Sequence, residues 1–358
     1  MDAGRQRKLV GIEALRGVAA VAVVLYHVAR HLDLAYGAPR LMRLFQPGHA
    51  GVDLFFVLSG FIILHVHSAD IGRPERLGHY ARQRFLRLMP IYWIALLLTA
   101  LALAAGGNGA PSAGWLLWSA TLLPTWGEPL LGIAWTLQHE LLFYLLFAVL
   151  ILSRRWGMAL LALWIGWVGF GLAGIAVGAI PPRLSSIYNL EFLFGMGAAA
   201  LLASGRIAAP RLMAGVGAVL LLASGTGESL GLLDGYGDAA RLTNGIPAAL
   251  LIGGLAAWER QRGLWVPAVL RVLGAASYSI YLFQFLGLAV AWQIWGWLAP
   301  PSGLDGAGVV LPCFLMLGAV GVLGGVVMHR LVERPLLQWL RQRVAPRNRP
   351  AMGIAASR

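Results

Sequence analysis

The sequence predicts an all-α, polytopic membrane protein with about ten transmembrane helices and both termini in the cytoplasm. Hydrophobic residues make up 59% of the 358 residues and charged residues only 12%, with a mean hydropathy of +0.73. Soluble domains carry about 25% charged residues, so this composition excludes a soluble core. Apolar stretches of bilayer-crossing length recur along the chain. The positive charges also fall mostly on alternate connecting segments, which gives the orientation.

The apolar stretches can be assigned in order along the chain. The first follows the basic N-terminus and lacks a clear small-residue cleavage site, which favours an uncleaved membrane helix over a signal peptide. The seventh and eighth are short, so a tilted, broken or re-entrant course is open for them. Residues 111–124 are too few to cross, and Trp115 and Trp118 suit the membrane interface. The predicted spans are 9–30, 48–68, 85–106, 131–152, 157–180, 185–204, 209–225, 243–258, 272–297 and 307–330.

The basic charge follows this topology. Of the 28 Lys and Arg residues, 22 lie in segments predicted to be cytoplasmic, 5 lie in outer segments, and Arg16 lies inside the first span. That distribution is the positive-inside pattern of a multi-pass protein of the cell (inner) membrane. The net charge of +13 is therefore explained by topology, and we expect no nucleic-acid partner. The single cysteine, Cys313, lies in an apolar run and allows no internal disulfide.

The domain organisation is simple. Residues 1–340 contain no internal repeat or soluble appendage, so we expect one membrane domain. Residues 341–358 are polar and basic, and we expect a disordered cytoplasmic tail. The sequence assigns no oligomeric state.

Two polar side chains interrupt the first span, Arg16 and His27, eleven residues apart. Eleven helical residues turn through about 1100°, close to three full turns, and rise about 16 Å. Both side chains therefore lie on one stripe, which could line a passage across most of the bilayer. The alternative is that Arg16 reaches the inner headgroups and His27 sits near the outer interface.

Two carboxylates lie within other spans. Asp53 lies just inside the outer end of the second span, at a depth similar to that of His27, and could orient its imidazole. It could instead complement the helix dipole. Glu140 follows His139 in the fourth span, where both are costly to expose to lipid. A functional pair and a structural hydrogen-bonded pair both fit.

Arg84 and Arg87 lie one helical turn apart on the cytoplasmic side of the third span. Guanidinium groups bind phosphates through paired hydrogen bonds, so a phosphate site is one interpretation. An anchor for lipid headgroups is the other.

Other chemistries lack a motif. His65 and His67 form an H-x-H pair, but residues two apart do not share a helix face, and we expect no metal site. The chain has no serine-hydrolase elbow, P-loop or dinucleotide fingerprint.

Six segments, in order, resemble the acyltransferase-3 family of integral-membrane O-acyltransferases. The resemblance covers residues 11–336, and WTLQHELLFYLLF is most similar to bacterial members that modify exopolysaccharides. The segments are GIEALRGVAAVAVVLYHV, GVDLFFVLSGFII, RQRFLRLMPIYW, WTLQHELLFYL, LGAASYSIYLFQF and VERPL.

The resemblance implies a ten-helix fold, a cytoplasmic acyl-CoA donor, no permanently bound cofactor, and an acceptor at the outer face. It implies a catalytic role for His27 and functional roles for Arg16 and Glu140. It also implies a functional role for Arg84 and Arg87, which match the family's Arg-x-x-Arg.

The chain departs from the family at two positions. Glu13 replaces the usual Asp, which is a conservative change. Gln284 stands where the family commonly has His, so a second catalytic histidine is in doubt and more of the chemistry rests on His27.

The resulting hypothesis is transfer of an acyl group, by expectation acetyl, from cytoplasmic acyl-CoA to a sugar hydroxyl of an exported or cell-surface polysaccharide or a lipid-linked oligosaccharide. The three arginines would bind the donor phosphates, and His27 would act as base. Asp53 or Glu140 would orient the imidazole. The sequence leaves open direct transfer and an acyl-histidine relay. The alternative function is a polysaccharide or lipid-linked sugar transporter without acyl transfer.

Overall fold

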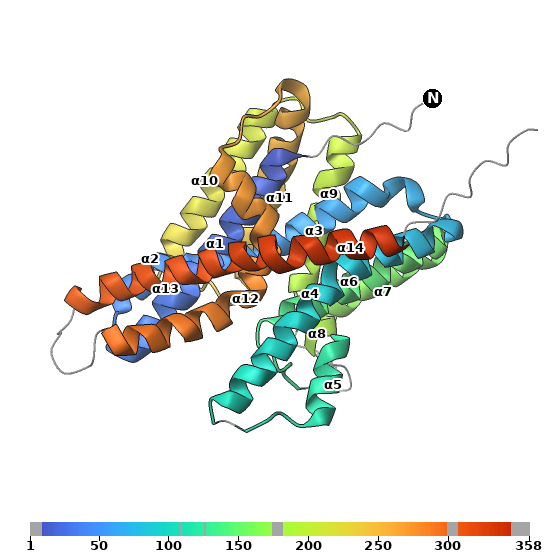
Figure 1. Cartoon of the computed structure of the whole chain (residues 1–358). Coiled ribbons are helices and arrows are strands. Elements are labelled where there is room, and N and C mark those ends of the chain that lie inside the picture. Colours follow the sequence, from blue (N-terminus) through green and yellow to red (C-terminus); the bar gives the residue numbers. More distant parts are fainter. Residues whose placement is uncertain (1–8, 108, 125–126, 174–181, 299–306, 345–358) are drawn as a thin grey trace, which may run out of the picture.

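A computed structural model describes residues 9–107, 109–124, 127–173, 182–298 and 307–344. Over these residues the chain is helical, with no β-strand, which confirms the predicted fold class (Figure 1). The helices are α1 (Val10–Tyr36), α2 (Pro39–Phe45), η1 (Gln46–Ala50), α3 (Gly51–His67), η2 (Ser68–Asp70), η3 (Pro74–Arg76), α4 (Leu77–Ala105), α5 (Ala113–Thr121), α6 (Ala134–Leu152), α7 (Arg154–Leu172), α8 (Pro182–Ser185), α9 (Tyr188–Ala203), α10 (Pro210–Ser229), α11 (Asp238–Arg262), α12 (Ala268–Leu298), α13 (Ala307–Met328), η4 (His329–Glu333) and α14 (Arg334–Val344).

Each predicted span coincides with a helix over the described residues, and the end of the fifth, 174–180, lies outside them. Within the described residues, nine helical stretches are long and apolar enough to cross a membrane. The sixth predicted span is α9, which has only 16 residues and is shorter than a bilayer crossing requires. The seventh and eighth predicted spans are the continuous helices α10 and α11, of 20 and 25 residues. A broken or re-entrant course is therefore not observed for either of them.

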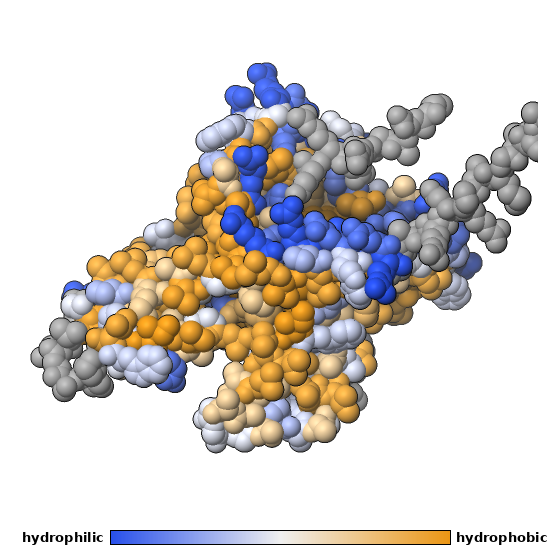
Figure 2. All heavy atoms as spheres, viewed as in Figure 1, coloured by the Kyte–Doolittle hydropathy of each residue, from blue (hydrophilic) through white to orange (hydrophobic). Residues whose placement is uncertain are grey.

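The exterior is that of a lipid-facing protein. Apolar side chains cover most of the visible face, and hydrophilic ones gather along α14 and at one end of the molecule (Figure 2). Exposed apolar residues such as Leu163 on α7 and Leu222 on α10 are 70% and 71% accessible. Such exposure would be unfavourable in water and is the expected state in contact with acyl chains.

Two close helix crossings set the positions of the functional side chains. α1 packs along α12 where Gly17 meets Gly274, and a Cβ on Gly17 would lie 2.6 Å from the backbone nitrogen of Gly274. α3 packs along α9 where Gly60 meets Gly195, and a Cβ on either glycine would collide with the backbone of the other helix. Small residues allow this approach in membrane helices. The first crossing brings the Arg16–His27 face of α1 against α12.

The C-terminal helix is longer than the tenth predicted span. α13 continues through the π-helical turn η4 into α14, so that residues 308–343 form one helical stretch. The predicted boundary between residues 340 and 341 therefore falls inside α14, whose last residues, 341–344, are helical rather than part of a disordered tail. The remainder of the predicted tail, 345–358, lies outside the described residues.

Candidate active site

A cavity of about 490 Å³ lies between α1, α3, α4, α6, α12 and α14. Its charged lining consists of Arg16, Arg84, Arg87, Arg341 and Glu140. The structure thus brings together the three arginines that the sequence selected, although they come from two different helices. Four guanidinium groups and one carboxylate give the cavity lining a net positive charge, and such a lining favours anionic ligands.

Arg84 is held by aromatic rings and one histidine. Its guanidinium lies over the rings of Tyr80 and Tyr144, at 5.8 and 5.6 Å from their centroids. Its Nη2 lies 3.1 Å from Nε2 of His67, which also pairs with Asp70. The Nε atom is buried and has no hydrogen-bond partner among the described residues. Arg84 therefore retains a donor for a bound anion.

Arg87 and Arg16 complete the basic floor of the cavity. Arg87 lies over the ring of Tyr278 at 5.0 Å, and its Nη1 is 3.5 Å from Oε1 of Glu333. Arg16 lines the cavity without a hydrogen bond or close ion pair to any described residue. Both arginines are half-buried, and the contact of Arg87 with Glu333 is long for a hydrogen bond. The guanidinium N–H groups of both residues are therefore available to a ligand.

Glu140 lies in this cavity and not beside His27. Its carboxylate accepts hydrogen bonds from Ser59, at 3.3 Å, and from Tyr144. His139, the preceding residue, points elsewhere and pairs with Asn189 at 2.8 Å. Adjacent helical residues face about 100° apart, which explains the separation. The expectation that Glu140 orients the imidazole of His27 is therefore corrected.

Gln284 on α12 is the partner of His27. The amide Nε2 of Gln284 donates to the carbonyl of Tyr281 at 2.9 Å, which directs Oε1 toward His27. Nδ1 of His27 lies 3.0 Å from that Oε1. An amide oxygen only accepts, so Nδ1 carries the hydrogen and Nε2 is left as the basic nitrogen. The residue that departs from the family pattern is thus the hydrogen-bond partner of His27.

Asp53 pairs with a different residue, Arg241 of α11. Arg241 Nη1 lies 2.7 Å from Oδ1 of Asp53, and both side chains are buried. Arg241 also donates to the hydroxyl of Tyr188 at 2.9 Å and to the carbonyl of Gly235. A buried guanidinium draws the carboxylate because neither charge is solvated there. The expectation that Asp53 orients His27 is corrected: its contacts tie α3 to α11.

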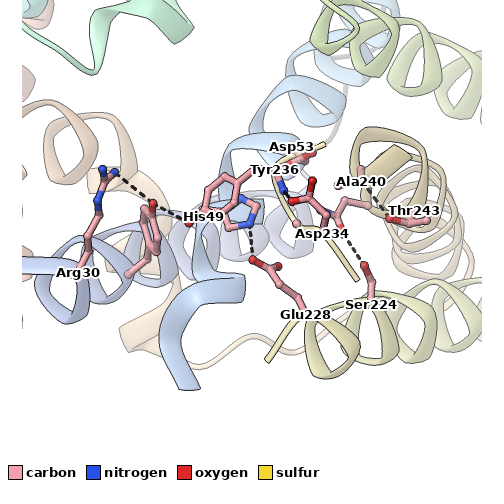
Figure 3. Close-up of polar contacts among 12 residues, drawn as sticks. Arg30, His49, Asp53, Ser224, Glu228, Asp234, Tyr236, Ala240 and Thr243 are labelled. Carbon is pink, nitrogen blue, oxygen red and sulfur yellow. Dashed lines mark hydrogen bonds and ion pairs between the residues drawn. The ribbon is translucent and has the colours of Figure 1, made fainter. Parts of the chain in front are cut away.

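A second polar cluster, which includes His49, Glu228 and Tyr236 (Figure 3), is connected to His27 through Tyr26. His49 Nε2 lies 2.9 Å from Oε1 of Glu228, and the His49 ring stacks on Tyr236 at 4.6 Å. The hydroxyl of Tyr236 bonds to that of Tyr26 at 3.0 Å, and the Tyr26 ring lies 4.9 Å from the His27 ring. These contacts join the loop before α11 to α1, so they fix the surroundings of His27.

The arginine cavity does not reach His27. Its lining includes Arg16, Phe55 and Tyr281, but not His27. The rings of Phe55 and Tyr281 lie 5.8 Å apart, and Tyr281 is one turn of α12 from Gln284. The described residues therefore show a cavity at the Arg16 end that is not lined by His27, rather than one continuous passage along this face of α1.

Sequence reasoning missed two residues of this arrangement. Arg241 is one of the five basic residues that the topology places in outer segments, and it lies only two residues before the predicted span 243–258, where a buried partner is a reasonable expectation. Arg341 was assigned to the tail. The amphipathic pattern of RPLLQWLRQRV was a signal that the helix continues to this position.

The fold is helical and of membrane-spanning length, and it holds an arginine-lined cavity and a separate histidine paired with a buried glutamine. The comparisons give the family: a model of the acyltransferase domain (Acyl_transf_3) matches residues 9–330. The chain belongs to the acyltransferase-3 family and is a membrane O-acyltransferase.

Several characterised proteins are similar to the chain. The exopolysaccharide production protein ExoZ of Rhizobium meliloti (strain 1021) is 30% identical over 319 residues, which are 85% of this chain and 94% of ExoZ. The acyltransferase MdmB of Streptomyces mycarofaciens is 26% identical, with 94% and 93% covered. The peptidoglycan O-acetyltransferase OatA of Listeria monocytogenes is 29% identical over only 25% of this chain and 13% of OatA. No solved structure matches the chain significantly.

Proposed function

We propose that the protein transfers an acyl group from a CoA thioester to a sugar hydroxyl of an exported polysaccharide. The observation that carries the proposal is the cavity of about 490 Å³ lined by four arginines, which suits the phosphates of the donor. The polysaccharide acceptor rests on the names of ExoZ and OatA. The proposed location is the cell (inner) membrane, with the donor entering from the cytoplasm.

The donor would span the distance between the two parts of the site. Arg16 and His27 are separated by eleven residues of α1, which is about 16 Å of helix rise. The donor phosphates would stay with the arginines while the thin pantetheine arm extends toward His27. Phe55 and Tyr281 would turn aside to admit it, and in the free enzyme they would keep the two sides separated.

The reaction at His27 follows from its tautomer. Gln284 would hold the hydrogen on Nδ1, so that Nε2 accepts the proton of the attacking hydroxyl. The hydroxyl oxygen would form the new ester bond to the thioester carbon as the carbon–sulfur bond breaks. The imidazolium would then return its proton to the departing thiolate, and free CoA would leave. Glu140 would hold the arginine end of the cavity in place rather than act on the acceptor.

Substitution of Arg84 tests the donor site. With purified protein in nanodiscs, free CoA is expected to be released from acetyl-CoA only when acceptor sugar is present. Arg84→Gln should raise the donor KM about tenfold or more, since a charged hydrogen bond to phosphate is worth about 1.5–3 kcal/mol. Arg155→Gln, which removes an exposed arginine of α7, is the matched control and should change the donor KM by less than about twofold. Equal donor KM values for wild type and Arg84→Gln would show that Arg84 does not bind the donor phosphates. Transport of the acceptor without release of CoA would favour the alternative function of a sugar transporter.

Substitution of Gln284 tests the orientation of His27. Gln284→Ala removes the acceptor for Nδ1–H, so we expect kcat to fall about tenfold with donor KM within about twofold. Gln138→Ala, which removes another buried glutamine without contact to His27, should leave kcat within about twofold. An unchanged kcat in Gln284→Ala would show that the bond has no catalytic consequence.

A further inference from the structure

The last helix of the described chain contributes to the donor cavity. Arg341 of α14 lies in the cavity lining together with Arg16, Arg84 and Arg87. Its backbone carbonyl is 3.5 Å from Nη2 of Arg82, so α14 also contacts α4 directly. Hydrophilic side chains mark the course of α14 on the surface (Figure 2). A helix that follows the last span thus contributes an arginine to the cavity lining.

The π-helical turn η4 fixes where α14 begins. Glu333, at 1% exposure, ends this turn and accepts from Ser279 Oγ at 2.7 Å. The same carboxylate lies 2.8 Å from His329 Nδ1 and 3.5 Å from Arg87 Nη1. π-Helical turns are rare and occur often at functional sites. The turn therefore links the start of α14 to the arginine pair of α4 and to α12.

The four arginines differ in depth. Arg341 is exposed, whereas Arg16, Arg84 and Arg87 are half-buried. A donor that extends its pantetheine arm inward leaves its adenosine end outermost, near the exposed arginine. The 3′-phosphate on that end carries up to two negative charges and is the group that Arg341 can reach without displacing the other three.

We propose that Arg341 binds the 3′-phosphate of the CoA donor, so that α14 makes the enzyme selective for CoA over donors that lack this phosphate. This inference rests on the proposed function, because it assumes a CoA thioester in the cavity. The same guanidinium chemistry would suit the phosphate of a lipid headgroup, and the experiment separates these two sources.

The experiment compares two donors and two arginines. Initial rates are measured with acetyl-CoA and with acetyl-dephospho-CoA, which lacks only the 3′-phosphate. We expect wild type to show a KM about tenfold lower for acetyl-CoA, and Arg341→Gln to lose most of that difference by raising the KM for acetyl-CoA alone. Arg343→Gln is the matched control: its guanidinium lies over the Trp339 ring at 4.7 Å, it makes the same charge change on the same helix, and it does not line the cavity.

The outcomes distinguish the 3′-phosphate of the donor from the phosphate of a lipid headgroup as the group that Arg341 binds. The inference is overturned if Arg341→Gln keeps the wild-type preference for acetyl-CoA over acetyl-dephospho-CoA. It is also overturned if Arg343→Gln loses that preference to the same extent, because the effect would then come from the net charge of α14. An effect of Arg341→Gln that appears in anionic-lipid nanodiscs but not in neutral ones would assign the arginine to lipid headgroups and also overturn it. Failure of wild type to release CoA from either donor would overturn the proposed function itself, and it differs from all of these because the variants would then have no rate to compare.

Discussion

Replacing His27 with alanine is expected to reduce acyl transfer by about 10²–10⁴-fold, the usual contribution of a positioned general base. The change removes Nε2, the nitrogen that the Gln284 contact leaves free to accept a proton. Donor binding should persist, because the arginine cavity does not include His27 in its lining. The measurement is acetyl transfer to polysaccharide by the purified protein, together with CoA binding to the same sample.

The control for this prediction lies one turn further along α1. His31 is on the same face as His27, and its ring packs on Trp292 at 4.4 Å. It has no hydrogen bond to Gln284, so His31→Ala should retain transfer to within about fivefold of wild type. Transfer by His27→Ala within tenfold of wild type would remove this histidine from the mechanism. Loss of CoA binding in the same variant would instead indicate a folding defect.

The helices were predictable because their signal is local. Each span is a contiguous run of apolar residues, and the requirement that backbone groups be satisfied inside a bilayer leaves a helix as the outcome. The meeting of Arg16 with Arg84 and Arg87 was inferred from their common side of the membrane, and the structure places all three in one cavity.

The partners of the buried charges could not be predicted in the same way. Asp53 and Arg241 are 188 residues apart, and His27 and Gln284 are 257 apart. Which side chains meet depends on the rotation and depth of each helix, and these follow from crossings such as Gly17 against Gly274. A shared depth for His27 and Asp53 does not specify the direction in which a carboxylate points. In the structure the carboxylate of Asp53 is paired with Arg241.

Replacing Arg241 with leucine is expected to prevent accumulation of folded protein. Removing one member of a buried ion pair costs about 3–5 kcal/mol, which is a large part of the stability of a typical domain. The cost is raised here because Arg241 also donates to the Tyr188 hydroxyl and to the Gly235 carbonyl, so the change removes these hydrogen bonds as well. Size-exclusion chromatography of the detergent-extracted protein, followed by thermal unfolding, measures this loss. Arg183→Leu, which removes an arginine paired with exposed Glu128, should be tolerated.

The double variant Asp53→Asn/Arg241→Gln distinguishes a structural role for Asp53 from a catalytic one. It replaces the ion pair by a neutral amide pair that can still hydrogen-bond. We expect it to recover part of the folded yield and, per folded molecule, to transfer acyl groups at a rate within about tenfold of wild type, because neither residue contacts His27. A double variant that folds and binds CoA but has lost transfer as completely as His27→Ala would mean that the carboxylate of Asp53 acts in the reaction. The pairing with Arg241 would then be a resting arrangement that the bound substrates replace.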